Sequence, residues 1–380
     1  MEPKPARRQY RFLTRAKHAI LWAFKVLQRY TRRGFWQRFV VFITAALVLA
    51  VGSMYGIAQW YIQSHKDEPL VLGTSFIPAY AESLGLDAQE TMDALINDLG
   101  VRHFRLVSYW NQAEPEQGKY DFSLLDWQFA KAESVGAQVT LSLGLRQPRW
   151  PECHMPDWAK MLPSGAEAGT WQSALLDYIE EVVNRYKNSP ALDSYQLENE
   201  YFLHGFGNCE DLLGEQWAFD RDRLVREYDL VKRLDPYTKL IIARSNNALG
   251  TPIGEPTPDE FAISVYKRVW SPPIGRYMEY PFPAWYYAFV AGVQKMVTDK
   301  DMMIHELQAE AWPPGGNVLA ASLEEQNKSI NDDRLEKRIK FAEGTGMREV
   351  YLWGSEYWYY RLVKLNDPSL WNVAKQTFKD

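Results

Sequence analysis

The sequence predicts an α/β protein built as a (β/α)8 barrel (a TIM barrel) and preceded by a single N-terminal transmembrane helix. Three observations support this prediction. Residues 39–61 form an uncharged apolar run, residues 70–380 alternate apolar strands with amphipathic helices, and several of these strands end in acidic, amide or aromatic residues. A barrel of this kind gathers its functional side chains at the carboxyl ends of its strands, so the second and third observations fit one architecture.

The apolar run FVVFITAALVLAVGSMYGIAQWY covers 23 positions without a charge. At about 1.5 Å rise per residue, a helix of this length crosses the ~30 Å hydrocarbon layer of a bilayer. Trp36, Trp60 and Tyr61 stand at its ends, where amphipathic rings prefer the membrane interface. A cleaved signal peptide is the alternative, but the run is long and begins only after 38 residues. We therefore expect residues 39–61 to remain as a signal-anchor.

The charge distribution predicts how this anchor is oriented. Residues 1–38 hold eleven Lys or Arg and one acid, Glu2, whereas the remainder of the chain has a net charge of −15. The positive-inside rule then leaves the segment 1–38 in the cytoplasm and places the following domain across the membrane. Residues 18–30 form either an amphipathic helix on the inner membrane face or a cytosolic tail. A basic head on an acidic body indicates a lipid bilayer as partner and does not indicate a nucleic-acid enzyme.

After a short polar linker at 62–69, the predicted domain covers residues 70–380 without a second linker. Buried strands are expected at 70–76, 103–108, 138–145, 191–198, 239–244, 260–266, 301–308 and 348–355. Amphipathic helices are expected at 87–100, 123–136, 170–187, 219–235, 283–300, 323–346 and 368–378. In the first of these, Asp87 is the expected N-cap and Gly100 the stop.

Eight strands that alternate with helices over about 310 residues are typical of the (β/α)8 barrel. A doubly wound open sheet is the main alternative. That fold usually carries a glycine-rich phosphate-binding turn after its first strand, and the segment LGTSFIPAYAESLG at 72–85 contains no such turn.

The predicted strand ends supply a mouth rich in carboxylates and aromatic rings. In strand order, the side chains expected there are Arg105, Tyr109, Trp110 and Asn111; Arg146 and Trp150; Glu198, Asn199 and Glu200; Ser245 and Asn246; Tyr266; His305, Glu306, Gln308 and Glu310; and Trp353, Glu356 and Trp358. Two facing carboxylates suit the hydrolysis of glycosidic bonds, because one must be protonated to donate to the leaving oxygen and the other ionised. Glu200 and Glu306, on the fourth and seventh strands, are the candidate pair.

Several motifs in this order resemble the large clan of retaining glycoside hydrolases that carry catalytic glutamates on strands 4 and 7, the superfamily that includes cellulases and β-galactosidases. The motifs are NE closing strand four, IHELQAEAW around strand seven, YLWGSEYW around strand eight, and SYWNQAEPEQGKYDFSLLDW at 108–127. The resemblance covers roughly residues 70–360. One residue departs from it, because Tyr201 stands where many members have proline.

The resemblance implies roles for individual residues. Glu200 would be the acid/base and Glu306 the nucleophile, with Asn199 binding the sugar 2-hydroxyl. Arg105 and Tyr266 would support the nucleophile, and Trp353 would form a platform under the sugar at the cleavage point. Two alternatives stay open: Glu198 in place of Glu200, and Glu310 in place of Glu306. Trp110 and Trp150 are further candidates for contact with substrate.

The sequence therefore predicts a membrane-anchored glycosidase that cleaves O-glycosidic bonds by double displacement, with β-linked bonds as the expected substrates. Two other readings use the same mouth: a non-catalytic carbohydrate-binding or cell-surface assembly protein, and a transglycosylase in which a sugar replaces water. No metal and no organic cofactor is implied, since there is no CxxC motif and no histidine cluster at ligand spacing. Cys153 and Cys209 fall in the loops after strands three and four, so a disulfide between these loops is expected. The oligomeric state, the sugar and the choice between endo and exo cleavage are left open.

Overall fold

The computed structural model describes residue 25 and residues 34–245 and 254–379. The predicted cytoplasmic segment 1–38, its possible helix 18–30 and the candidate Asn246 lie largely or wholly outside these residues. The chain divides into two compact units at Ile57–Ala58, and each unit is considered by itself.

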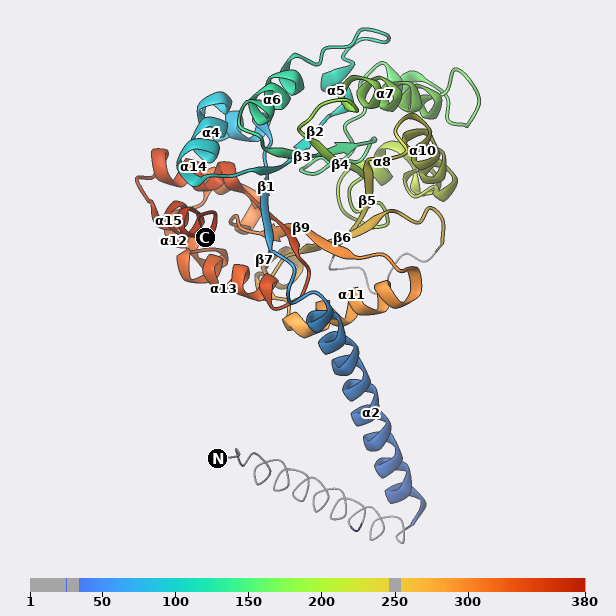
Figure 1. Ribbon diagram of the computed structural model, residues 1–380, viewed down its shortest axis with the longest axis vertical. Coiled ribbons are helices and arrows are strands. Elements are labelled where there is room, and N and C mark those ends of the chain that lie inside the picture. The colour runs from blue at the N-terminus through green and yellow to red at the C-terminus, as the bar shows by residue number, and fades with distance from the viewer. Residues whose placement is uncertain (1–24, 26–33, 246–253, 380) are drawn as a thin grey trace, which may run out of the picture. The chain divides into compact units, whose positions relative to one another are not determined.

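The N-terminal apolar run forms the long helix α2, Phe35–Ser64 (Figure 1). Between Phe35 and Ile57 its large apolar side chains are mostly exposed, and its length and composition would allow it to cross a membrane. The helix extends beyond the predicted bounds of 39–61 at both ends.

The last turns of α2 belong to the second unit, where they form part of the barrel floor. Tyr61 is buried and its hydroxyl donates a hydrogen bond to the backbone oxygen of Met302 at 3.4 Å. His65 Nε2 lies 3.0 Å from Asp301 Oδ1, and Arg348 donates to the backbone oxygen of His65 at 2.7 Å. The predicted linker 62–69 is therefore corrected in its first half, because residues 62–64 continue the helix and His65 is anchored to the barrel.

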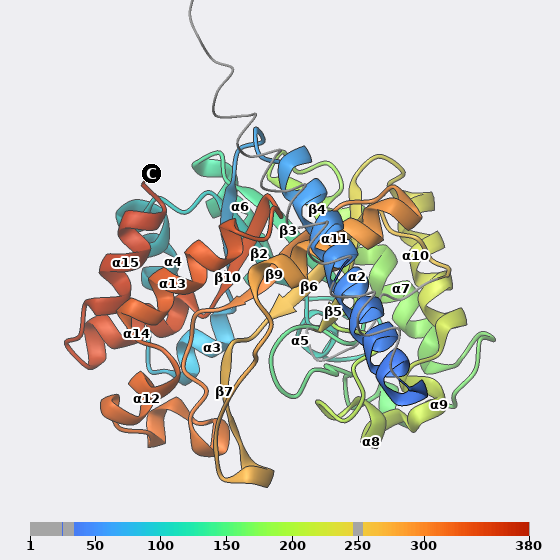
Figure 2. The same cartoon turned by 90° about the horizontal axis from the view of Figure 1, so that it is seen from below.

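The (β/α)8 barrel predicted from the sequence is confirmed. Eight strands close in the order β1-β10-β9-β6-β5-β4-β3-β2, and all neighbouring pairs are parallel. The barrel strands are β1 (Val71–Ser75), β2 (His103–Val107), β3 (Gln138–Leu143), β4 (Leu192–Leu197), β5 (Lys239–Ser245), β6 (Glu260–Val265), β9 (Met302–Gln308) and β10 (Glu349–Trp353). Figures 1 and 2 show these strands at the centre with helices around them.

The helices of the second unit surround the barrel strands. They are α3 (Pro78–Ser83), α4 (Ala88–Ala94) with the π-helical turn Leu95–Leu99, α5 (Trp110–Ala113), α6 (Ser123–Ser134), α7 (Trp171–Tyr186), α8 (Cys209–Leu213), α9 (Glu215–Ala218), α10 (Arg221–Leu234), α11 (Ala284–Thr298), α12 (Leu323–Ser329), α13 (Asp332–Glu343), α14 (Ser355–Lys364) and α15 (Ser369–Thr377). Four short 3-10 turns occur at Ala159–Met161, Pro272–Ile274, Pro314–Gly316 and Val318–Ala320. As expected, Asp87 caps α4 by accepting from Glu90 N, and Gly100 ends the π-helical turn with φ 83°.

Three features around the barrel differ from the sequence-based expectation. The single helix expected at 323–346 is two helices, because Ile330 between α12 and α13 is extended. The connection from β6 to β9 contains a hairpin of β7 (Arg268–Ser271) and β8 (Arg276–Glu279), which lies beside the barrel strands in Figure 2. The eighth strand ends at Trp353, and Glu356 and Trp358 lie in α14 instead of on the strand.

The middle of the barrel is filled by a polar layer that supports the mouth above it. Gln196 Oε1 accepts a hydrogen bond from Arg105 Nε at 2.6 Å and lies 3.3 Å from His305 Nδ1. The other ring nitrogen of His305 lies 2.9 Å from Ser264 Oγ. Burial and the charge of Arg105 hold the pKa of His305 well below its usual range, so this ring is neutral.

Candidate active site

The fourth strand ends in a bend that turns its two glutamates into different surroundings. Glu198 and Glu200 both adopt positive φ, at 55° and 44°, which non-glycine residues adopt only when the surrounding structure holds them there. The carboxylate of Glu198 accepts from the backbone nitrogens of Leu145 and Arg146, each at 2.8 Å, and from Arg223 at 2.9 Å. Glu198 is therefore committed to joining β4 to the loop after β3, and Glu200 is the acid at the mouth.

The carboxylate of Glu306 on β9 accepts hydrogen bonds from two donors. Arg105 Nη1 donates to its Oε1 at 2.8 Å, and the hydroxyl of Tyr266 donates to its Oε2 at 2.8 Å. The guanidinium and Glu306 are both buried, so water screens this ion pair little. Burial and the negative charge of Glu306 in turn raise the pKa of Tyr266 well above its usual range, which keeps the phenol a donor.

Glu310, the alternative to Glu306, lies past the end of β9 in a different set of contacts. Its Oε1 accepts from the indole nitrogen of Trp353 at 2.8 Å, and its Oε2 accepts from Arg149 Nη2 at 3.1 Å. These contacts fix Trp353, which is buried, at the end of β10. Glu310 therefore orients the expected sugar platform, and Glu306 is the carboxylate that Arg105 and Tyr266 support.

Glu200 has the opposite electrostatic environment to Glu306. It is buried, and its Oε1 has no hydrogen-bond partner among the described residues. Burial, together with the charges of Glu306 and Glu152, raises the pKa of Glu200 to about 8. The site thus pairs a carboxylic acid whose raised pKa keeps it protonated near neutral pH with a carboxylate that accepts from Arg105 and Tyr266.

Asn199 connects the fourth strand to this network. Its Oδ1 accepts from Arg105 Nη2 at 2.9 Å and from Gln196 Nε2 at 3.2 Å, and its Nδ2 donates to Glu152 Oε2 at 3.2 Å. Both ends of the amide are therefore fixed, and one Nδ2 hydrogen remains for a ligand.

Two acids at the mouth were missed or misplaced by the sequence-based reasoning. Glu152 is buried in the loop after β3, where burial raises its pKa to about 7 although Arg146 is close by. Glu356, expected at the end of strand eight, starts helix α14 and accepts from Ile77 N, and burial raises its pKa to about 7. In the loop sequence PRWPEC, Glu152 stands between Trp150 and Cys153, but the sequence does not show which way its side chain points.

The aromatic candidates divide into three groups. Trp353 is buried at the mouth, as expected, with the guanidinium of Arg149 4.5 Å from its ring centre. Trp110 is corrected: it is fully buried, its indole donates to Glu114 Oε2 at 2.8 Å, and it stacks on Tyr178, so it packs the turn after β2 and is not open to a ligand.

Trp150 lies at the surface and begins a row of rings that leads towards Glu306. Its exposed fraction is 67%, and its ring centre is 6.3 Å from that of Phe206. Phe206 is 6.3 Å from Trp312, and Trp312 is 5.4 Å from Tyr266, the donor to Glu306. Such rings suit the apolar faces of sugars.

The disulfide expected from the sequence is present. Cys153 and Cys209 are bonded, with Cα atoms 5.2 Å apart, and join the loop after β3 to the start of α8. In the same place Arg146 donates to the backbone oxygens of Leu203 and Phe206, at 2.9 and 3.1 Å. The loop after β3, which carries Glu152, is therefore fastened to the loop that follows Glu200.

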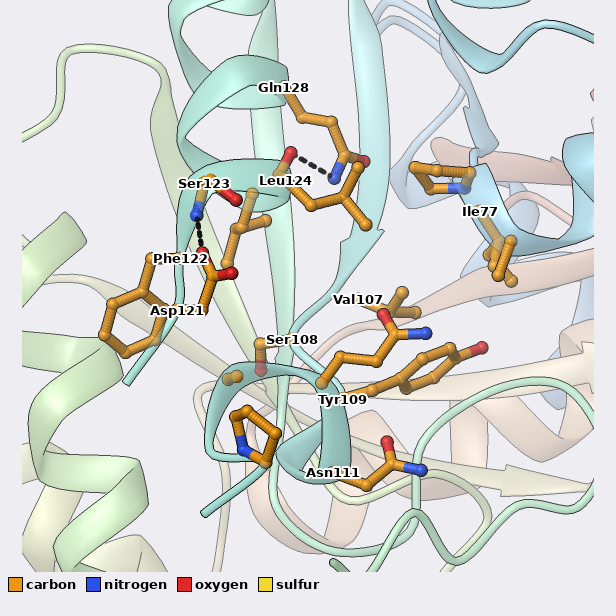
Figure 3. A pocket seen from close by; sticks show the side chains of 16 residues that line it. Ile77, Val107, Ser108, Tyr109, Asn111, Asp121, Phe122, Ser123, Leu124 and Gln128 are labelled. Atoms are coloured by element: carbon orange, nitrogen blue, oxygen red, sulfur yellow. Dashed lines mark hydrogen bonds between the residues drawn. The ribbon is translucent and has the colours of Figure 1, made fainter. Parts of the chain in front are cut away.

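A separate cavity of about 320 Å³ lies beside the mouth, between the loops after β1 and β2 and the start of α6 (Figure 3). A buried cluster of Ile77, Val107, Tyr109 and Trp353 stands at this part of the mouth, and neither Glu200 nor Glu306 lines the cavity. Two of its polar side chains are used locally, since Asp121 accepts from Ser123 N at 2.9 Å and Gln128 Nε2 donates to the backbone oxygen of Leu124 at 3.0 Å, as Figure 3 shows. We therefore place the chemistry at the barrel mouth and not in this cavity.

No group of three or more His, Cys, Asp or Glu side chains in the part of the chain that the structure describes is arranged to hold a metal ion.

Comparison with known proteins shows similarity to glycosidases. A family model described as Glyco_hydro_42, beta-galactosidase, matches residues 84–237. The beta-galactosidase Bga of Halorubrum lacusprofundi is 24% identical over 152 residues, which is 36% of this chain and 21% of that protein. The matched region thus spans about a fifth of the length of that relative.

Solved structures share the fold at low sequence identity. Xylanase 10B from Thermotoga petrophila superposes with a TM-score of 0.52 and 13% identity, over 82% of this chain and 94% of the xylanase. The exo-beta-1,4-mannosidase Op5Man5 from Opitutaceae bacterium strain TAV5 gives a TM-score of 0.52 at 15% identity, over 75% of this chain and 51% of that protein. These structures show the same fold, and the family match supports the resemblance to glycoside hydrolases that the sequence motifs indicated.

Proposed function

We propose that this chain, a member of the (β/α)8 glycoside hydrolase superfamily, hydrolyses β-galactosides or closely related β-glycosides with retention of configuration. The relatives matched by sequence are named beta-galactosidases, which makes galactosides the first substrates to test. The observation that carries the proposal is the contrast between two buried glutamates. Glu306 accepts from Arg105 and Tyr266, whereas Glu200 has a pKa raised to about 8.

In the first step, Glu306 attacks the anomeric carbon while Glu200 donates its proton to the departing oxygen. A bond forms between the Glu306 carboxylate and the sugar, the glycosidic bond breaks, and the alcohol leaves with the proton. When the Glu306 carboxylate becomes an ester it loses its negative charge. That charge is the largest cause, second only to burial, of the raised pKa of Glu200. Glu200 is then a stronger acid, and its conjugate base can activate water for the second step.

The surrounding residues would hold the sugar in register. The free Nδ2 hydrogen of Asn199 is positioned to donate to the sugar 2-hydroxyl, because its Oδ1 is already occupied by Arg105 and Gln196. Trp353 would lie under the ring at the cleavage point. The rings of Trp150, Phe206 and Trp312 extend outward from Tyr266 and would accept further sugar units or an aglycone.

We also propose that helix α2 anchors the enzyme in a membrane. The support is the exposed apolar surface of residues 35–57 and the charge of residues 1–38, which hold eleven basic residues against a single acid. With that orientation the barrel would face away from the cytoplasm, where a disulfide such as Cys153–Cys209 persists.

The function is tested with the full chain in detergent micelles against a panel of aryl β-glycosides, with Glu200→Gln and Glu306→Gln as paired controls. The proposal predicts turnover of at least one substrate by the parent protein and a loss of ~1000-fold or more in each variant. Turnover that survives in Glu306→Gln removes the proposed nucleophile. Binding of glycans without any turnover would favour the carbohydrate-binding alternative.

A further inference from the structure

Glu152 is a third carboxylate at the mouth, and the double displacement described above does not use it. Its side chain is buried, its Oε2 accepts from Asn199 Nδ2 at 3.2 Å, and the same oxygen lies 3.5 Å from Arg146 Nε. Burying an acid costs free energy, and a single ion-pair partner at the edge of hydrogen-bond distance offsets little of it. The presence of Glu152 here therefore points to a function.

The backbone at Glu152 is held in an unfavourable conformation. Its φ is 78°, in the left-handed region that a side chain with a Cβ disfavours by about 1 kcal/mol or more. Short hydrogen bonds fix it there: Glu152 N donates to Arg149 O at 2.9 Å, and Gln147 N donates to Glu152 O at 2.9 Å.

The loop after β4 presses against Glu152 from the other side. A Cβ on Gly207 would lie 2.7 Å from Glu152 Cβ and Cγ, so only glycine permits this approach. Asn208 N donates to Pro151 O at 3.0 Å, Asn208 Oδ1 accepts from Cys153 N at 3.1 Å, and the disulfide follows at once. Two loops are thus built to hold one acid against Asn199.

We propose that Glu152 is a positioning residue of the active site, which orients the amide of Asn199 towards the sugar and places a negative charge beside Glu200. This inference rests on the proposed function. With Glu152 accepting one Nδ2 hydrogen and Arg105 donating to Oδ1, the amide of Asn199 cannot flip, and its second Nδ2 hydrogen is left to donate to a ligand.

The charged surroundings fix the sign of the second effect. Glu200 is faced by Glu306 on β9, by Glu152 and Arg146 on the loop after β3, and by Tyr266 after β6. Glu306 and Glu152 raise the pKa of Glu200, and Arg146 lowers it. Removing the negative charge of Glu152 therefore lowers the pKa of Glu200 directly. Because Arg146 also pairs with Glu152, its positive charge is then no longer balanced, and this lowers the pKa of Glu200 further.

The variant Glu152→Gln tests this effect, because its amide oxygen can still accept from Asn199. The basic limb of the pH profile of kcat/KM, which reports the proton donor of the free enzyme, should move to lower pH by about one unit. Glu356→Gln is the matched control: it neutralises another buried acid with a raised pKa and should leave the limb in place. An unmoved limb in Glu152→Gln overturns the electrostatic role.

The variant Glu152→Ala tests the orientation of Asn199, since no acceptor remains for Nδ2. It should lower kcat/KM for glycosides about tenfold or more while affecting the matching 2-deoxyglycosides much less, because these lack the hydroxyl that Asn199 would bind. An equal loss on both substrates would mean that Glu152 is a structural residue only.

A measurement without substrate separates failure of this inference from failure of the proposed function. If the parent protein turns over no glycoside, the proposed function fails. The coupling between Glu152 and Glu200 is then measured by denaturant unfolding of Glu152→Gln, Glu200→Gln and the double variant at pH 8. The inference predicts that the double variant gains less stability than the two single gains together, and additive effects would overturn it.

Discussion

The raised pKa of Glu200 makes the stability of the barrel depend on pH in a way that one isosteric substitution reveals. In the unfolded chain this carboxyl would titrate at its ordinary value of 4.5, whereas in the folded protein it titrates at about 8. Between these values the folded state binds more protons than the unfolded state, so the free energy of unfolding falls as pH rises. Relative to a pH at which the carboxyl is protonated in both states, the free energy of unfolding is lower by about 1 kcal/mol at pH 5 and by about 3 kcal/mol at pH 7.

Glu200→Gln removes this titration. The free energy of unfolding of the variant minus that of the parent protein should therefore be about 2–3 kcal/mol larger at pH 7 than at pH 5. Any pH-independent cost of burying an amide cancels in that difference. Burial and the neighbouring acids cause the effect, so an exposed carboxylate such as Glu116 should not show it.

The assay is equilibrium denaturant unfolding of the full chain in micelles, followed by the fluorescence of its 15 tryptophans, at pH 5 and pH 7. Glu116→Gln serves as the control. If Glu200→Gln changes the free energy of unfolding equally at both pH values, Glu200 is not held protonated, and its assignment as the proton donor loses its physical basis.

Three further changes test other parts of the site and the fold. Tyr266→Phe removes one of the two donors to Glu306 and should lower kcat about 10- to 100-fold, because a hydrogen bond to a charged group contributes ~1.5–3 kcal/mol; unchanged kcat would contradict the assignment of Glu306. Replacing both cysteines with serine opens a bridge across 56 residues and should lower the free energy of unfolding by ~2–4 kcal/mol in denaturant titrations, and an unchanged midpoint would contradict a structural role. Tyr61→Ala should destabilise the barrel by ~3–5 kcal/mol because Tyr61 is buried against its floor, whereas Trp60→Ala, one residue away and 46% exposed, should have little effect on the same unfolding transition.

The sequence predicted the barrel and the acidic strand ends well because both depend on local patterns. Apolar strands alternate with amphipathic helices, and residues at the carboxyl ends of parallel strands necessarily share one mouth. Glu200, Glu306, Asn199 and Arg105 were found in this way, and the structure brings all four into one hydrogen-bonded or electrostatically coupled group.

The remaining features depend on directions that a linear pattern does not contain. Trp110 follows a strand end like its neighbours, but a short helix turns its ring into the core. Glu152 reaches the site only because its backbone takes a left-handed turn between two fastened loops. The floor contacts of His65 lie in a polar segment that looks like a linker, because a hydrogen bond to Asp301, 236 positions away, leaves no local signal in the sequence.

The most direct test of the account is to trap the covalent intermediate. A 2-deoxy-2-fluoro-β-galactoside with a good leaving group slows the second step more than the first, so the enzyme should accumulate a glycosyl ester that peptide mass spectrometry locates on Glu306. The label should be absent in Glu306→Gln. A label on Glu310, or hydrolysis that proceeds with inversion of the anomeric configuration, would contradict the roles assigned to the two glutamates.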